Sequence, residues 1–136
     1  MTSPFLRKAE TNLKSARMLL DAGDTDSACS RAYYAMYDAA RASLAWVGVV
    51  PERGEFKTHQ GLIAAFGLHL VKPGLFPADI GRFFHSTQSL RQTADYDAIP
   101  VSQKQAEQAL AAAEGFVAAA AGLIANRYQP PVQPSS

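Results

Sequence analysis

The densest group of reactive side chains lies between Arg91 and Asp97, where a guanidinium, two carboxylates and a phenol follow one another closely. The segment ends a predicted helix whose apolar side, at about 100° per residue, comprises Ile80, Phe83, Phe84, Thr87, Leu90 and Ala94. Arg91 should project at the edge of that side, and a guanidinium is costly to bury alone because it keeps its charge. We therefore expect it to pair with Asp95, one turn later. A plain ion pair at a helix end would explain the same spacing.

A second polar group recurs on one face of a predicted helix over residues 26–47. Its members follow at spacings of three and four, which places them side by side: Arg31, Tyr34, Asp38 and Arg41. They could be amphipathic side chains at the rim of the core, with hydroxyls that reach water. They could equally be a polar, aromatic wall that lines a cleft against the helix carrying Arg91.

His59 stands at the start of a third predicted helix, over residues 58–70. The positive end of the helix dipole disfavours an imidazolium there, so His59 could act as a neutral hydrogen-bonding group. A structural role for this lone histidine stays open. With three scattered histidines and a single cysteine, we predict no metal site and no cofactor. The sequence also lacks a glycine-rich phosphate loop and a nucleophile elbow.

The composition predicts that helices position these groups. Of the residues, 48% are apolar, alanine dominates and strand-favouring runs are few. We predict an all-α fold, an antiparallel up-and-down bundle of four to five helices. The predicted first residues of the helices carry capping side chains: Ser3 with Pro4, Asp24 to Asp26, Asp79, and Ser102 with Gln105. The bundle should span residues 1–128, and the Pro/Ser-rich residues 129–136 read as a disordered tail.

Charge and cysteine content narrow the classes of partner. A net charge of +1 gives no field that would coat the chain with nucleic acid or draw it to a membrane surface, so any nucleic-acid contact must be local. The single Cys29 excludes an internal disulfide and suggests a core position in a reducing compartment. We expect no stretch apolar enough to span a membrane and therefore a cytoplasmic protein.

Three segments in series resemble the HEPN family, in its small stand-alone branch of bacterial and archaeal proteins. They are residues 28–41 (ACSRAYYAMYDAAR), 57–62 (KTHQGL) followed by Phe66-Gly67, and 90–97 (LRQTADYD). Their order and separation match from about residue 5 to residue 126. The resemblance implies a helical bundle that is commonly a homodimer. It also implies a frequent partner, a minimal nucleotidyltransferase encoded next door, the two acting as toxin and antitoxin.

In active members of this family, an arginine, a spacer of four to six residues and a histidine form a metal-independent ribonuclease site, usually shared by two protomers. Arg91 matches the arginine, but after the spacer 92–95 the place of the histidine is held by Tyr96. A phenol with a pKa of about 10 is a poor general base at neutral pH. Active members also carry a tyrosine that the partner modifies with AMP, a position that Tyr96 does not match.

Two hypotheses follow from this departure. The protein could be a ribonuclease toxin of altered chemistry, in which Tyr96 or His59 replaces the usual histidine beside Arg91. It could instead be a module that does not hydrolyse RNA but binds a nucleotide, RNA or the transferase partner, and the missing histidine favours this second hypothesis. In either case we expect the binding residues to be Arg31, Tyr34, Asp38, Asp95 and Asp97.

Overall fold

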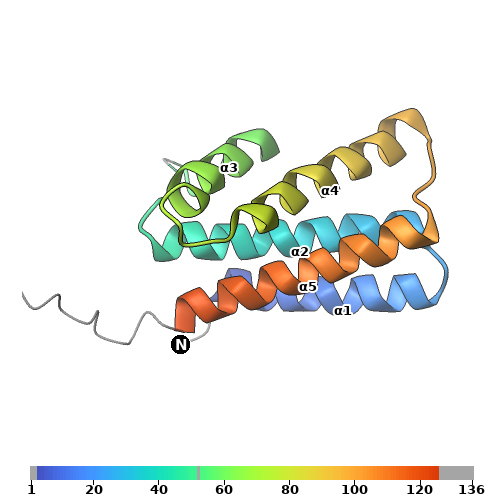
Figure 1. The fold of residues 1–136 in the computed structure, drawn as a ribbon, viewed down its shortest axis with the longest axis horizontal. Helices are drawn as coiled ribbons and strands as arrows, with labels where there is room; N and C mark the ends of the chain where they lie inside the picture. The colour runs from blue at the N-terminus through green and yellow to red at the C-terminus, as the bar shows by residue number, and fades with distance from the viewer. Residues whose placement is uncertain (1–2, 52, 126–136) are drawn as a thin grey trace, which may run out of the picture.

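The computed structural model describes residues 3–51 and 53–125, and over these residues it contains helices and no strand. The elements are α1 (Pro4–Asp21), α2 (Thr25–Trp46), α3 (His59–Phe66), the short π-helix η1 (Gly67–Val71), α4 (Ala78–Asp97) and α5 (Gln103–Ala125) (Figure 1). The predicted all-α bundle is therefore confirmed. The predicted boundary at residue 128 and the tail beyond it lie outside the described residues.

Local capping signals explain where most helices begin. A side-chain oxygen accepts the backbone amide three positions later at Ser3, Asp24 and Thr58. At the start of α5, the Ser102 hydroxyl accepts the amide of Gln105, and the Gln105 side chain accepts the amide of Ser102, both at 3.0 Å. This reciprocal pair satisfies two amides that the first turn leaves free, as predicted.

Two expectations for α4 were wrong. The helix begins at Ala78 with Pro77 in the capping position, and Asp79 lies in its first turn, where its carboxylate accepts only the amide of Ile80. Proline fixes φ in a range suited to a helix start, so the chain enters the helix before it reaches the aspartate. Phe83 is 49% exposed and not part of the apolar face, which is narrower than the sequence pattern indicates. Phe84 and Thr87 are the residues of that face that are buried in the core.

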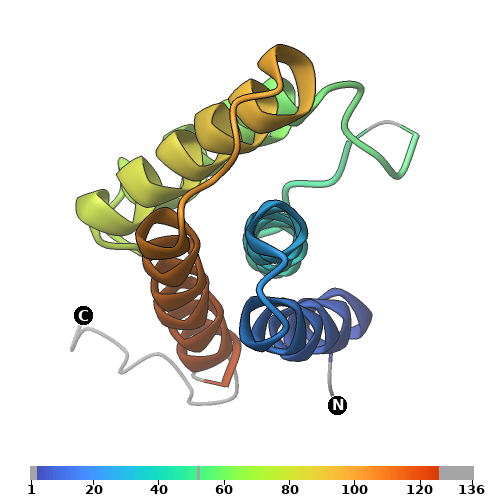
Figure 2. The same ribbon diagram turned by 90° about the vertical axis from the view of Figure 1, so that its right-hand side faces the viewer.

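α2 is the central helix of the bundle and contacts all the other helical elements. Figure 2 views α2 nearly end on, with α1 below it, α4 above it and α5 beside it. Close approach is possible because half of the buried positions of α2 are alanine: Ala28, Ala32, Ala35, Ala39, Ala40 and Ala42. Small side chains let helix axes come together without cavities, as the composition predicted.

An aromatic cluster holds α3 and α4 on α5. The rings of Phe66, Phe76, Phe84 and Phe116 are all buried, and their contacting pairs have centroids 4.9–5.8 Å apart. The ring of Phe84 also packs against Tyr33 of α2 at 5.8 Å. Burial of such rings contributes a large share of core stability, so α4 is held firmly against α2.

The expectation that no stretch is apolar enough to span a membrane was wrong for α5. By length and composition alone, Gln103–Ala125 passes that test because alanine fills it. In the bundle, α5 packs on α1, α2 and α4, so the apolar stretch also serves as a core helix. Its outward side carries small exposed residues at spacings of four and three: Ala111, Gly115, Ala118 and Gly122.

Candidate functional site

Arg91 lies on the inner side of α4 with its side chain only 13% exposed. Its Nη1 donates to Asp95 Oδ2 at 2.8 Å, which confirms the predicted pair. Its Nε donates to Gln88 Oε1 at 3.1 Å. Sequence reasoning missed Gln88, although its position three residues before Arg91 is a helical neighbour. Because Gln88 is itself buried, the guanidinium is held in one orientation.

The guanidinium of Arg91 also lies over two tyrosine rings of α2. Its central carbon is 5.1 Å from the ring centroid of Tyr33 and 5.7 Å from that of Tyr34. Both distances are in the range where a cation is attracted to the face of a ring. The polar face of α2 is therefore divided: Arg31 and Tyr34 line a hollow together with Asp95 of the Arg91 helix, whereas Asp38 and Arg41 face α1.

His59 joins the same group from the start of α3. Its Nδ1 lies 3.0 Å from the Tyr33 hydroxyl, and its ring packs among those of Tyr33, Tyr34 and Tyr37 with centroids 4.8–5.9 Å apart. Burial and, after it, the nearby charge of Arg91 lower the pKa of His59. Its ring is therefore neutral near pH 7, as predicted. The cause, however, is burial and the charge of Arg91, whereas the sequence pointed to the helix dipole.

The Tyr33–His59 hydrogen bond has a preferred direction. Tyr33 is fully buried, its hydroxyl contacts no other hydrogen-bonding group among the described residues, and burial raises its pKa. If His59 donated, the phenol proton would be left without an acceptor in a dry site, which costs about 1–3 kcal/mol. We infer that Tyr33 donates to Nδ1, so that the proton of neutral His59 sits on Nε2. Nε2 forms no hydrogen bond within the described part of the chain and can donate to a ligand.

Two surface hollows lie beside this cluster and share Arg31 and Tyr34. One, of about 390 Å³, is lined by Leu19, Asp26, Ser27, Ser30, Arg31, Tyr34 and Asp95. The other, of about 360 Å³, lies between α1 and α2 and is lined by Lys8, Asn12, Arg31, Tyr34, Tyr37, Asp38 and Arg41. The structure thus brings together four of the five predicted binding residues, on either side of the Tyr34 ring.

Asp38 is the acidic residue of the second hollow. Its carboxylate is buried and accepts from Asn12 Nδ2 at 3.0 Å. Burial raises the pKa of Asp38, and the charges of Lys8 and Arg41 and the Asn12 hydrogen bond only partly oppose that rise. Arg31 is exposed and donates to Asn12 Oδ1 at 3.4 Å.

Tyr96 and Asp97 lie apart from the cluster. Tyr96 is 79% exposed, Asp97 is the exposed last residue of α4, and neither lines the two hollows. Five residues after Arg91, Tyr96 is turned about 140° away around the helix, so both side chains cannot face α2. The roles proposed for Tyr96 and Asp97 stay predictions.

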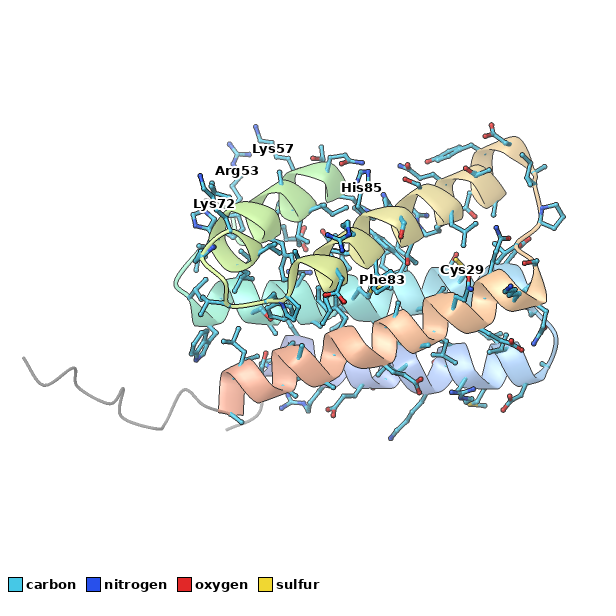
Figure 3. The ribbon with its side chains drawn as sticks, viewed as in Figure 1. Cys29, Arg53, Lys57, Lys72, Phe83 and His85 are labelled. Carbon is cyan, nitrogen blue, oxygen red and sulfur yellow. The ribbon has the colours of Figure 1, made fainter. Side chains whose placement is uncertain are left out.

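Cys29 lies inside the bundle on α2, beneath α4 (Figure 3). Burial raises the pKa of its thiol to about 11, with a further rise from the nearby charge of Asp26. It is therefore a neutral core residue, as its type suggested. Across residues 3–51 and 53–125, no group of three or more His, Cys, Asp or Glu side chains is arranged to hold a metal ion.

Comparison with known proteins agrees with the resemblance seen in the sequence. The profile of the HEPN domain matches residues 2–123. A UPF0332 protein of Gloeobacter violaceus is 35% identical over 124 residues, which covers 90% of this chain and 94% of the relative. A protein of Methanocaldococcus jannaschii named "Putative toxin" is 35% identical over 109 residues, 80% of this chain and 78% of the relative. A UPF0332 protein of Thermotoga maritima is 31% identical over 119 residues, 87% and 86% of the two chains. The chain therefore belongs to the HEPN family.

Proposed function

We propose that this protein is the toxin-like component of a toxin–antitoxin or defence system and that it binds a phosphate group of RNA or of a nucleotide at Arg91. Two relatives carry the name "Putative toxin", which supports the first part. The second rests on the way Arg91 is held: Nε and Nη1 are engaged by Gln88 and Asp95, whereas Nη2 forms no hydrogen bond with the described residues. A fixed guanidinium with a spare donor suits a phosphate oxygen.

His59 strengthens this proposal because its Nε2 is inferred to be a second donor near Arg91. Two donors that need no reorganisation favour an anion over a neutral ligand. A donor at Nε2 is also the wrong protonation state for a group that removes the proton of a 2′-hydroxyl. Since Tyr96 is turned away from the cleft, binding without hydrolysis is the function that these contacts favour.

The partners proposed for this activity are a second copy of the chain and a minimal nucleotidyltransferase as antitoxin. Both come from membership of the HEPN family. A nucleotidyltransferase reading frame beside the gene, and co-purification of the two products, would support the paired system. Purification of this chain without such a partner, from cells that produce both products, would argue against it.

Ligand binding tests the function directly. A single-stranded oligoribonucleotide and a mononucleotide would be titrated against the wild type, Arg91→Ala, and Arg82→Ala as an exposed arginine of the same helix. Loss of a charged hydrogen bond worth about 1.5–3 kcal/mol should weaken binding by Arg91→Ala roughly 10- to 100-fold. Arg82→Ala should bind like the wild type. Equal affinity for the wild type and Arg91→Ala would refute the proposed site.

The same proteins, incubated with RNA in the absence of metal, test the ribonuclease alternative with Tyr96 or His59 beside Arg91. Cleavage that Arg91→Ala abolishes would establish the nuclease in place of the binding module. Circular dichroism of each variant shows that the bundle is intact. Arg91→Lys should retain part of the affinity, because it keeps the charge and loses the planar fork.

A further inference from the structure

The hollow between α1 and α2 gathers positive charge that the Arg91 site does not use. Lys8, Arg31 and Arg41 line it, and among the described residues the one carboxylate in the lining is the buried, hydrogen-bonded Asp38. Because three cations share the lining with a single carboxylate, their positive charge is not fully balanced there. Such a concave, positively charged surface attracts an anion.

None of these three cations forms a salt bridge among the described residues, where the ion pairs are Arg17–Glu114 and Arg91–Asp95. Arg41 is nevertheless held in place, because its guanidinium lies 4.0 Å above the centre of the Phe5 ring. Arg31 contacts only a neutral amide oxygen, that of Asn12. Arg31 and Arg41 are thus positioned by neutral groups, which leaves their charges available to an anion.

Two tyrosines connect this hollow to the Arg91 site. Tyr34 lines the hollow, and its ring also lies under the Arg91 guanidinium. Tyr37 lines the hollow, and its ring centroid is 4.8 Å from that of His59. Alternation of cations with aromatic rings is the pattern by which proteins hold a single strand, whose phosphates follow the charges and whose bases stack on the rings.

We propose that the hollow lined by Lys8, Arg31 and Arg41 is a second phosphate subsite, and that the ligand is a single-stranded oligonucleotide spanning it and the Arg91 site. This inference rests on the proposed function and extends it from one phosphate to a strand. A mononucleotide would fill the Arg91 site alone. An oligonucleotide would add a second phosphate and should therefore bind more tightly.

The test compares a short single-stranded oligoribonucleotide with a mononucleotide by fluorescence anisotropy and calorimetry. The Lys8→Gln/Arg41→Gln double variant should bind the oligonucleotide about tenfold or more weakly than the wild type and keep its affinity for the mononucleotide. The slope of log affinity against log salt should fall by about 0.7 for each phosphate that no longer pairs with a cation. Lys14→Gln/Lys104→Gln removes the same charge from exposed positions outside the hollow and should leave both affinities near the wild type.

Three results would overturn the inference. The wild type could bind the oligonucleotide no more tightly than the mononucleotide, the Lys8/Arg41 variant could match its charge control, or both variants could lose affinity for both ligands equally. Arg41→Lys alone, with Lys8 intact, should keep most of the wild-type affinity for the oligonucleotide. It keeps the charge and loses packing on Phe5, so it separates the two effects. Failure of the proposed function is distinguishable, because Arg91→Ala would then leave mononucleotide binding unchanged.

Discussion

Among single residues, Tyr33 has the most consequences for the site, because it contacts both Arg91 and His59 from a fully buried position. Tyr33→Phe would keep the ring and remove the hydroxyl. The His59 Nδ1 would lose its donor, and we expect the free energy of unfolding to fall by about 1 kcal/mol. Tyr37→Phe is the matched control, since the Tyr37 hydroxyl makes no hydrogen bond within the described residues, and it should change stability by less than half as much.

Urea denaturation of both variants measures this difference. Nitrogen-15 spectra of His59 give an independent check: in the wild type Nε2 should carry the proton and Nδ1 should not. A protonated Nδ1 in the wild type would contradict the inferred direction of the hydrogen bond. It would also restore Nε2 as a base for the ribonuclease alternative.

The pH dependence of stability reports on His59 as well. Its pKa is lowered in the folded state, so the unfolded chain takes up the proton first as the pH falls below about 6.5. The free energy of unfolding should therefore decrease from about pH 6.5 downwards, until the pH passes the folded-state pKa. Above that window His59 is neutral in both states and adds no slope.

His59→Gln should lack this contribution, and the difference between its stability profile and that of the wild type should be confined to the same window. The raised pKa of Asp38 acts in the opposite sense, because the folded state then binds its proton first as the pH falls. That contribution is present in both chains and cancels in the difference. Parallel profiles for the two proteins would show that His59 does not titrate as described.

At the scale of the helices, the capping pair Ser102–Gln105 decides where α5 starts and hence how α5 meets α4. Ser102→Ala would leave the amide of Gln105 without its partner and should lower the free energy of unfolding by about 1 kcal/mol. Ser86→Ala, at an exposed position inside α4, should be neutral or slightly stabilising because alanine favours helix. Thermal denaturation of both variants tests this, and an equal loss in the two would rule out a special role for the cap.

The helices themselves were predictable where the signal is local. Ser3, Asp24 and the Ser102–Gln105 pair act on amides three residues away, so spacing alone identifies them. The π-helical turn at Gly67–Val71 and the outward turn of Phe83 were not predicted. Both are decided by how α3, α4 and α5 pack on one another, which periodicity within one helix does not report.

The candidate site, too, was predictable only where its contacts are local in the sequence. The Arg91–Asp95 pair follows from helical spacing within α4 and was predicted. The Tyr33–His59 contact joins α2 to α3 across 26 positions of the sequence, and no local pattern connects those two residues. The sequence places Tyr33, Tyr34 and Tyr37 within α2, but spacing alone does not say which of them is buried under Arg91.

For the whole molecule, the outer side of α5 is notable because no other described helix covers its row of small residues. Ala111, Gly115, Ala118 and Gly122 lie exposed on the outer side of α5 and follow at spacings of four and three. Small residues in such a row let a second helix approach closely, and a two-fold axis would place the same row of another copy against it. We therefore predict a homodimer that packs α5 against α5.

Sedimentation velocity should accordingly give twice the mass of the 14.6 kDa chain at micromolar concentration. Ala118→Arg places a long charged side chain in the middle of this face and should weaken the dimer by about tenfold or more, the equivalent of at least 1.4 kcal/mol. It should leave the helical content unchanged, because Ala118 is exposed in the single chain. Ala45→Arg, at an exposed position of α2, is the control and should remain dimeric. A monomeric wild type, or an Ala118→Arg variant as dimeric as the control, would place any self-association elsewhere on the molecule.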